Sequence, residues 1–269
     1  MSYRSSPRRR SVLTTIATGG LVAVGGCASR ESSESGAGAL SDVRVEGTEL
    51  VVEYESETSA TGLAVIAPSG EAFAERALTP GASLETIPLG MSYPPGTYTV
   101  QLVDADRVVA AVEQLLRPDV VIRELKLARN HPDEMYEGAA SLTITGEVIV
   151  DLENVGTGPE KLTKLQFDGD VPQPTLDELS ESGIAAVDKP VTYTEPVIGS
   201  GERRTIYSRT LPFGPRSEDI TCTPEGTSGR FGVSLTGEVG GKLAEQEYNV
   251  TYQGENLSEC QITIERIDT

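Results

Sequence analysis

The sequence has few of the residues from which active sites and metal centres are built. It contains no tryptophan, one histidine and three cysteines among 269 residues. A Ser-His-Asp triad could use only His131, which lies beside Pro132 in a polar segment, and we interpret it as a solvated loop residue. A zinc centre needs several histidine or cysteine ligands, and the sequence shows no phosphate-binding glycine loop or dinucleotide fingerprint. We therefore expect no enzyme and no cofactor.

Positive charge is also scarce. The chain has 22 Lys and Arg residues against 41 Asp and Glu residues, which gives a formal net charge of −19. Nucleic acid is a poor partner for such a chain, because phosphate binding needs basic patches. The profile resembles that of proteins from extremely halophilic archaea, where salt shortens the Debye length to about 3 Å at 1 M and dense carboxylates repel each other little. An ordinary acidic surface protein is the alternative.

The sequence has no apolar run long enough to cross a bilayer, which needs roughly 20 residues. Its apolar stretch at Val12–Val24 is shorter and is interrupted by threonine and glycine. A basic start, a short apolar segment and small residues after it are typical of an export signal. Arg9 and Arg10, followed by Ser11-Val12-Leu13, resemble the twin-arginine export pattern. We therefore predict a signal peptide over residues 1–26.

The end of that signal resembles a lipoprotein lipobox. Val24, Gly25 and Gly26 precede Cys27, which the resemblance implies is lipidated and becomes the new N-terminus. A plain cleavable signal with an incidental cysteine is the alternative. Residues 27–40 are rich in Ser, Gly and Glu and cannot bury enough apolar surface to fold. As a flexible tether they would reach on the order of 20 Å from the membrane.

The chain after the tether alternates apolar and polar residues with the period of two that indicates half-buried strands. About seven short strands separated by turns predict a small β-sandwich over residues 41–117. Gly96-Thr97-Tyr98-Thr99-Val100 resembles the start of strand F in immunoglobulin-like domains. The resemblance implies that Tyr98 forms a tyrosine corner and that Val100 takes the position of the usual cysteine.

A larger β-sandwich is predicted over residues 118–269, because Pro118 cannot donate to a central ladder and marks a boundary. Residues 142–152 read as one strand with an apolar face. The pattern E-N-x-G-x-G-P around Asn154, with Gly201-Glu202 downstream, resembles CARDB-type (cell-adhesion-related) immunoglobulin-like domains, which implies an extracellular interaction module. An insert near residues 168–194 departs from that pattern and contains the only expected helix, Leu176–Ser182.

The remaining cysteines and the sequons also indicate an exported chain. Cys222 and Cys260 are expected to form a disulfide in an oxidising compartment, with two free thiols as the alternative. Asn249 and Asn256 each begin an N-glycosylation sequon on a segment expected to be exposed. Asp168 and Asp170 form a weak candidate for a cation site, because oxygen-rich loops bind calcium, and otherwise no metal is expected.

The sequence thus predicts an all-β chain of two immunoglobulin-like β-sandwiches after a disordered signal and tether. Its expected function is non-catalytic binding or scaffolding at the extracellular face of the cell membrane, held there by a lipid anchor. The expected partner is another surface or membrane protein. Two alternatives remain open: an accessory or solute-binding lipoprotein of a transporter, and an exported hydrolase that uses Asp168, Asp170 and Glu178.

Overall fold

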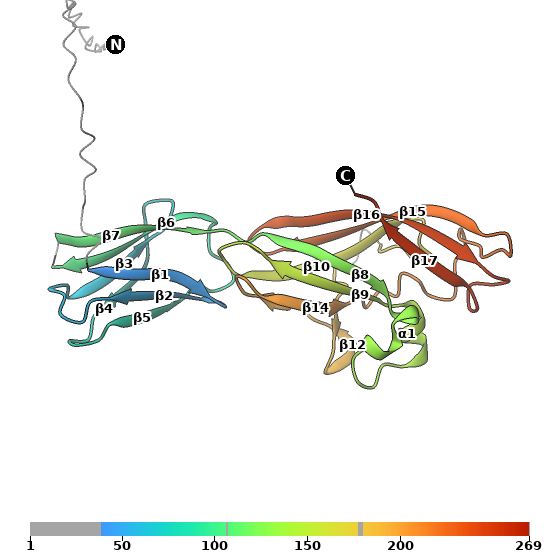
Figure 1. Cartoon of the computed structure of the whole chain (residues 1–269), viewed down its shortest axis with the longest axis horizontal. Coiled ribbons are helices and arrows are strands. Elements are labelled where there is room, and N and C mark those ends of the chain that lie inside the picture. Colours follow the sequence, from blue (N-terminus) through green and yellow to red (C-terminus); the bar gives the residue numbers. More distant parts are fainter. Residues whose placement is uncertain (1–38, 106, 177–179, 269) are drawn as a thin grey trace, which may run out of the picture. The chain divides into compact units, whose positions relative to one another are not determined.

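The structure is a computed structural model that describes residues 39–105, 107–176 and 180–268 (Figure 1). Nearly all regular structure in these residues is β-strand, which confirms the all-β prediction. The predicted signal and Cys27 lie outside the described residues, as does the tether up to residue 38. Within the described part, no helix is long and apolar enough to cross a membrane.

The first β-sandwich pairs a three-stranded sheet with a four-stranded sheet. The smaller sheet has the order β1-β2-β5 and the larger has the order β4-β3-β6-β7, both antiparallel. This is the strand order of an immunoglobulin-like sandwich, with A-B-E facing C-F-G and one further edge strand. The strands are β1 (Leu40–Glu46), β2 (Glu49–Tyr54), β3 (Gly62–Ile66), β4 (Ala72–Ala77), β5 (Leu84–Pro88), β6 (Gly96–Asp104) and β7 (Arg107–Leu116).

The core of this sandwich confirms the predicted tyrosine corner. Tyr98 and Val100 on β6 are fully buried. The hydroxyl of Tyr98 donates to the backbone oxygen of Pro94 at 2.8 Å, four residues upstream. The ring of Phe73 packs edge-on against Tyr98, with the centroids 5.3 Å apart. The corner therefore joins β6 to the loop before it, as expected for strand F.

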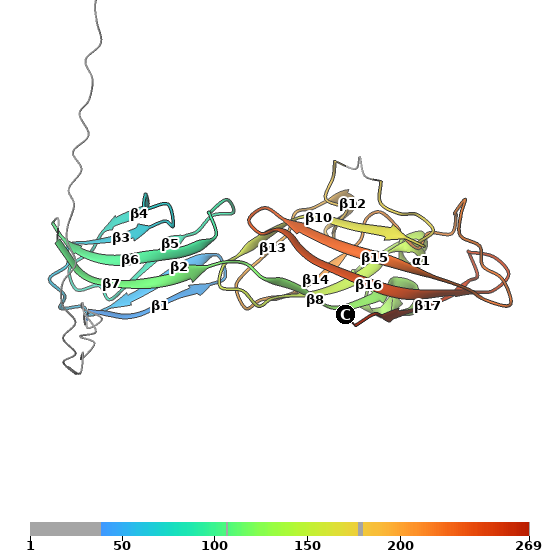
Figure 2. The ribbon, with the colours of Figure 1, turned by 90° about the horizontal axis from the view of Figure 1, so that it is seen from above.

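The second β-sandwich repeats this strand order. One sheet has the order β14-β9-β8, and the other has the order β13-β10-β15-β16-β17, so that β17 is added beside β16 (Figure 2). A short hairpin, β11–β12, lies within the predicted insert. The strands are β8 (Val120–Leu127), β9 (Val148–Asn154), β10 (Glu160–Gly169), β11 (Ala185–Ala186), β12 (Lys189–Tyr193), β13 (Val197–Ile198), β14 (Arg203–Tyr207), β15 (Thr227–Gly237), β16 (Gly241–Gln253) and β17 (Gln261–Arg266).

Aromatic side chains fill the centre of the second sandwich. Phe231 on β15 stacks on Tyr248 of β16 with the ring centroids 5.2 Å apart, and Phe213 meets Phe231 edge-on at 5.4 Å. All three are buried together with Phe167 of β10. Such offset and edge-on pairs add to the stability that their buried area provides.

Two sequence predictions in this half are wrong. Residues 142–147 are not strand: α1 (Ser141–Gly146) is a short α-helix, and β9 begins at Val148. Leu142 is 56% exposed, so its place in the apolar alternation does not reflect sheet packing. Of the expected helix at Leu176–Ser182, Leu176 and residues 180–182 are non-helical, and residues 177–179 lie outside the described residues. Two 3-10 turns, η1 (Ala128–Asn130) and η2 (Pro132–Glu134), precede α1.

Candidate functional sites

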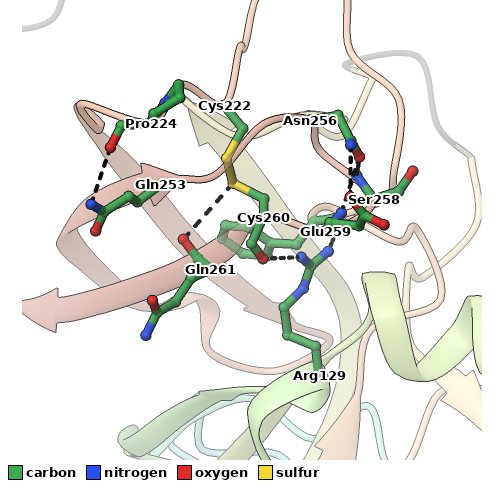
Figure 3. The surroundings of a disulfide bond; sticks show 10 residues. Arg129, Cys222, Pro224, Gln253, Asn256, Ser258, Glu259, Cys260 and Gln261 are labelled. Carbon is green, nitrogen blue, oxygen red and sulfur yellow. Dashed lines mark hydrogen bonds between the residues drawn. A yellow bond between two sulfur atoms is a disulfide. The ribbon is translucent and has the colours of Figure 1, made fainter.

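The predicted disulfide between Cys222 and Cys260 is present (Figure 3). It links the segment between β14 and β15 to the residue directly before β17, with the two Cα atoms 6.0 Å apart. Both side chains are buried, and Ile262 on the same face is fully buried as well. The inward orientation predicted for Cys260 is therefore confirmed, and the free-thiol alternative is not supported.

Arg129 binds the backbone beside this disulfide. Its guanidinium donates to the carbonyl oxygens of Thr145 and Phe213 at distances from 2.6 to 3.0 Å. It also donates to the carbonyl oxygen of Cys260 at 3.1 Å (Figure 3). No carboxylate of the described residues forms an ion pair with it, and burial lowers the pKa of Arg129 below its ordinary value. Arg129 thus connects η1 by hydrogen bonds to α1, to the segment after β14 and to the backbone at Cys260. The sequence did not predict this role, because an arginine in an acidic chain is expected to lie at the surface.

Both sequon asparagines are exposed. Asn256 lies in the turn between β16 and β17, where its Oδ1 accepts the backbone N–H groups of Ser258 at 3.0 Å and Glu259 at 3.1 Å (Figure 3). Asn249 lies on β16 between the neighbouring strands β15 and β17, while Tyr248 and Val250 on either side of it are buried. The predicted outward face of this strand is therefore confirmed, and glycosylation of either residue stays a prediction.

Asn154, the centre of the CARDB-like pattern, holds the turn after β9. Its side chain is fully buried and makes four hydrogen bonds to the backbone. The Oδ1 atom accepts the N–H groups of Asp119 and Gly156, both at 3.1 Å. The Nδ2 atom donates to the carbonyl oxygens of Gly158 at 2.8 Å and Ile198 at 3.3 Å. Asn154, the residue at the centre of the CARDB-like pattern, therefore has a structural role in this chain.

Glu160 plays a similar part at the start of β10. Its carboxylate is fully buried and accepts three backbone N–H groups, from Lys161, Val239 and Gly240, at 2.7 to 3.0 Å. These bonds attach β10 to the turn between β15 and β16. Hydrogen bonds to a charged acceptor are stronger than neutral ones, so this carboxylate stabilises the turn.

The weak cation site at Asp168 and Asp170 is not assembled in the structure. The Asp170 carboxylate accepts the backbone N–H of Arg230 at 2.9 Å, and Asp168 lies opposite Gly232 at the exposed end of β10. Across the part of the chain that the structure describes, no three His, Cys, Asp or Glu side chains gather where they could hold a metal ion. Glu178, which the hydrolase alternative would use together with these two residues, lies outside that part.

His131 lies in the loop between the two 3-10 turns, as predicted for a solvated histidine. Its side chain is 41% exposed, and Nδ1 lies 3.0 Å from Oε1 of Glu134. The same Glu134 carboxylate forms an ion pair with Lys126 at 2.7 Å. The imidazole therefore belongs to a surface cluster with Glu134 and Lys126.

Glu147 is a buried carboxyl that sequence reasoning missed. It is 2% exposed, its Oε1 accepts the hydroxyl proton of Tyr136 at 3.3 Å, and its Oε2 has no hydrogen-bond partner. Two further buried atoms without a partner, Nε of Arg209 and Oγ1 of Thr210, come from the segment after β14. Burial raises the pKa of Glu147 to about 7, against smaller lowering effects of the Tyr136 hydrogen bond and the Arg209 charge. The sequence did not indicate that Glu147 is buried, because Glu147 is one of 41 acidic residues and no local pattern sets it apart.

The Glu147 environment predicts a pH-dependent stability. The pKa of this carboxyl is about 7 in the folded chain, against a reference value of 4.5. At pH values between 4.5 and 7, the folded chain therefore holds a proton on Glu147 that the unfolded chain has released. The stability that protonated Glu147 contributes to the folded chain is fully present below the reference pKa. It is lost as the pH rises through the folded pKa. Between about pH 5 and about pH 8 the free energy of unfolding should fall by about 2 kcal/mol more in the wild type than in Glu147→Gln.

Denaturant unfolding of both chains at the two pH values, in high salt, measures this difference. Glu124→Gln, at an exposed position on β8, serves as the control. Parallel pH profiles for the wild type and Glu147→Gln would show that Glu147 does not carry the effect.

Comparisons with known proteins leave the family open. No known protein family and no curated protein matches the chain. Two solved structures are similar to this chain over most of both chains, with low TM-scores. A segment of two fibronectin type-III domains from chicken tenascin is 10% identical, with 85% of this chain and 99% of that chain covered and a TM-score of 0.28. The fibronectin(III)-like modules of Clostridium thermocellum CbhA are 12% identical, with 78% and 90% covered and a TM-score of 0.19.

A third similarity is confined to part of a larger protein. A beta-glucuronidase from glycoside hydrolase family 2 is 8% identical, with 82% of this chain covered and a TM-score of 0.25. The present chain spans only 20% of that enzyme's length. Scores of this size carry no argument about function, and the immunoglobulin-like assignment rests on the strand orders described above.

Proposed function

We propose that this chain is a lipid-anchored protein of the extracellular face of the cell membrane, which binds or scaffolds another surface or membrane protein. The observation that carries the proposal is the order of its parts. A twin-arginine-like signal ends in Val24-Gly25-Gly26-Cys27, a polar stretch follows, and two immunoglobulin-like sandwiches make up the rest. A lipidated cysteine before a flexible segment would hold such sandwiches near the membrane surface.

The second sandwich supports an exported location. A buried disulfide suits an oxidising compartment, because thiols in the cytosol are kept reduced. The two exposed sequon asparagines suit the same compartment. The acidic composition, with a net charge of −19, suits a medium of high salt, where surface carboxylates repel one another weakly.

Three polar side chains of the second sandwich have structural roles, which supports a binding module over an enzyme. Asn154, Glu160 and Arg129 all direct their polar atoms at backbone groups of the second sandwich. These contacts account for them as parts of the fold. The alternative of a solute-binding lipoprotein predicts alternating strands and helices, whereas α1 is the one α-helix of the described residues.

Fractionation of cells that express the full chain tests the anchor. The wild type should sediment with membranes, and Cys27→Ser should move to the soluble or secreted fraction because it cannot accept lipid. Ser29→Ala, two residues away, is the matched control and should stay with the membranes. Membrane retention of Cys27→Ser, or a wild type found in the cytosol, would contradict the proposal.

Cross-linking on intact cells tests the binding role. The wild type should give a reproducible product with one surface or membrane protein, while a cytosolic protein as the dominant product would oppose it. The hydrolase alternative can be tested in the same cells. If the chain shows hydrolase activity that is lost when Asp168, Asp170 and Glu178 are all changed to Asn or Gln, the non-catalytic proposal is wrong.

A further inference from the structure

The two N-glycosylation sequons occupy different parts of the fold. Asn249-Val250-Thr251 lies within β16, whereas Asn256-Leu257-Ser258 lies in the turn between β16 and β17. Both asparagine side chains are exposed, so exposure alone does not decide between them. A transferase reads the asparagine and the hydroxyl residue two positions later, so it needs access to the backbone of the sequon as well as to one side chain.

Strand pairing holds the sequon of Asn249 on both sides. Each of residues 249–251 is paired with a residue of β15 and with a residue of β17. Val250 in its middle is 1% exposed and belongs to the core, and the buried Tyr248 and Tyr252 flank it on the same face of the strand. An enzyme would have to pull β16 out from between its neighbours, and a core strand opens at a free energy close to that of global unfolding.

The sequon of Asn256 is held by contacts within its own turn. Oδ1 of Asn256 accepts the backbone N–H groups of Ser258 and Glu259, and Nδ2 donates to the Glu259 carboxylate at 3.1 Å (Figure 3). Ser258 is exposed, and Leu257 is partly buried against the core. Fitting this turn to an enzyme therefore costs local hydrogen bonds and part of the burial of one side chain, while both neighbouring strands stay paired.

The proposed export route makes this difference decisive. A twin-arginine signal such as Arg9-Arg10 directs a chain across the membrane after it has folded. A glycosyltransferase at the extracellular face would therefore meet β16 already paired with β15 and β17. This argument rests on the proposed function, because a chain exported unfolded would present both sequons in the same way.

We propose that Asn256 carries an N-linked glycan in the exported chain and that Asn249 does not. The donor is an oligosaccharide held on a lipid by a phosphate ester. Nδ2 of Asn256 forms a bond to the anomeric carbon of the first sugar and loses one proton to the enzyme. The bond from that carbon to the phosphate oxygen breaks, and the lipid phosphate leaves with the electron pair. The modified side chain keeps one N–H donor for Glu259 and the acceptor Oδ1, so the bonds of the turn are compatible with the glycan.

Mass spectrometry of peptides from the full chain, purified from cell membranes, tests the assignment. Cleavage after Glu255 separates the two sequons, and only the peptide with Asn256 should carry a glycan. Ser258→Ala should abolish the glycan, because it removes the sequon while Asn256 and the backbone N–H of residue 258 remain. Ser258→Thr keeps the sequon and should stay glycosylated. Thr251→Ala is the matched control on β16, because it removes the other sequon and should leave the glycan in place.

Unfolded acceptors test whether the fold makes the choice. Membranes from the same cells should glycosylate two synthetic peptides, residues 246–252 and residues 253–259, each with the sequon asparagine at its centre. Neither peptide has a sheet to hold it, so the protection of Asn249 should disappear. Rejection of the first peptide would place the choice in the local sequence and overturn the role of strand pairing.

The glycan pattern of the exported chain decides the proposal. A glycan at Asn249, with or without one at Asn256, would overturn it, and so would an exported chain that is bare at both sites. A chain that stays in the cytosol would contradict the proposed function and this proposal with it. Fractionation of the same cells distinguishes these two failures.

Discussion

Replacing both Cys222 and Cys260 with alanine is expected to lower the free energy of unfolding of the second sandwich by about 4 kcal/mol. The bond closes a loop with a sequence separation of 38 residues. Its loss lets the unfolded chain explore many more conformations, and in the chain-entropy model this is the main term. The backbone carbonyl of residue 260 remains in the variant, so the bond from Arg129 is retained and the cross-link alone is removed. Denaturant unfolding in high salt measures the change.

The control for this prediction is the wild-type chain under a strong reductant, which should lose a similar amount of stability. Cys27→Ser should leave the free energy of unfolding unchanged, because that residue precedes the described sandwiches. A loss below about 1 kcal/mol in the double alanine variant would mean that the loop is already restrained in the unfolded state.

Asn154→Leu is expected to lower the free energy of unfolding by about 3 to 4 kcal/mol. The change leaves the N–H groups of Asp119 and Gly156 and the carbonyls of Gly158 and Ile198 without their present partners. Each buried group left unsatisfied costs about 1 to 3 kcal/mol, reduced where water can enter. Thermal and denaturant unfolding should both show the loss.

An exposed asparagine on the same sandwich provides the comparison. Asn249→Ala, on the outer face of β16, should change the free energy of unfolding by less than about 0.5 kcal/mol. Equal effects of the two substitutions would show that the Asn154 network does not stabilise the turn after β9.

The sequence predicted most of the strands because one face of each is buried. Tyr248, Val250 and Tyr252 point into the core while Asn249 stays exposed, as the period of two requires. The tyrosine corner was predictable because Tyr98 acts within four residues of its partner, Pro94. The disulfide was predictable because assigning Cys27 to the predicted lipobox leaves Cys222 and Cys260 as a single pair.

Features that depend on long-range contacts could not be predicted. Helix α1 occupies a segment with the alternation of a strand, and its position is fixed by neighbours such as Arg129, which binds Thr145 from 16 residues away. The same arginine binds Phe213 and Cys260, and no local pattern links these positions. Glu147 differs from the exposed carboxylates by its burial, which is a property of the fold and not of the local sequence.

The mass of the N-terminal peptide of the chain, purified from cell membranes, tests the proposed anchor most directly. The account predicts a peptide that begins at Cys27 and carries a covalent lipid, with Arg9, Arg10 and the rest of residues 1–26 removed. A peptide that begins at another residue, or an unmodified Cys27, would contradict the account.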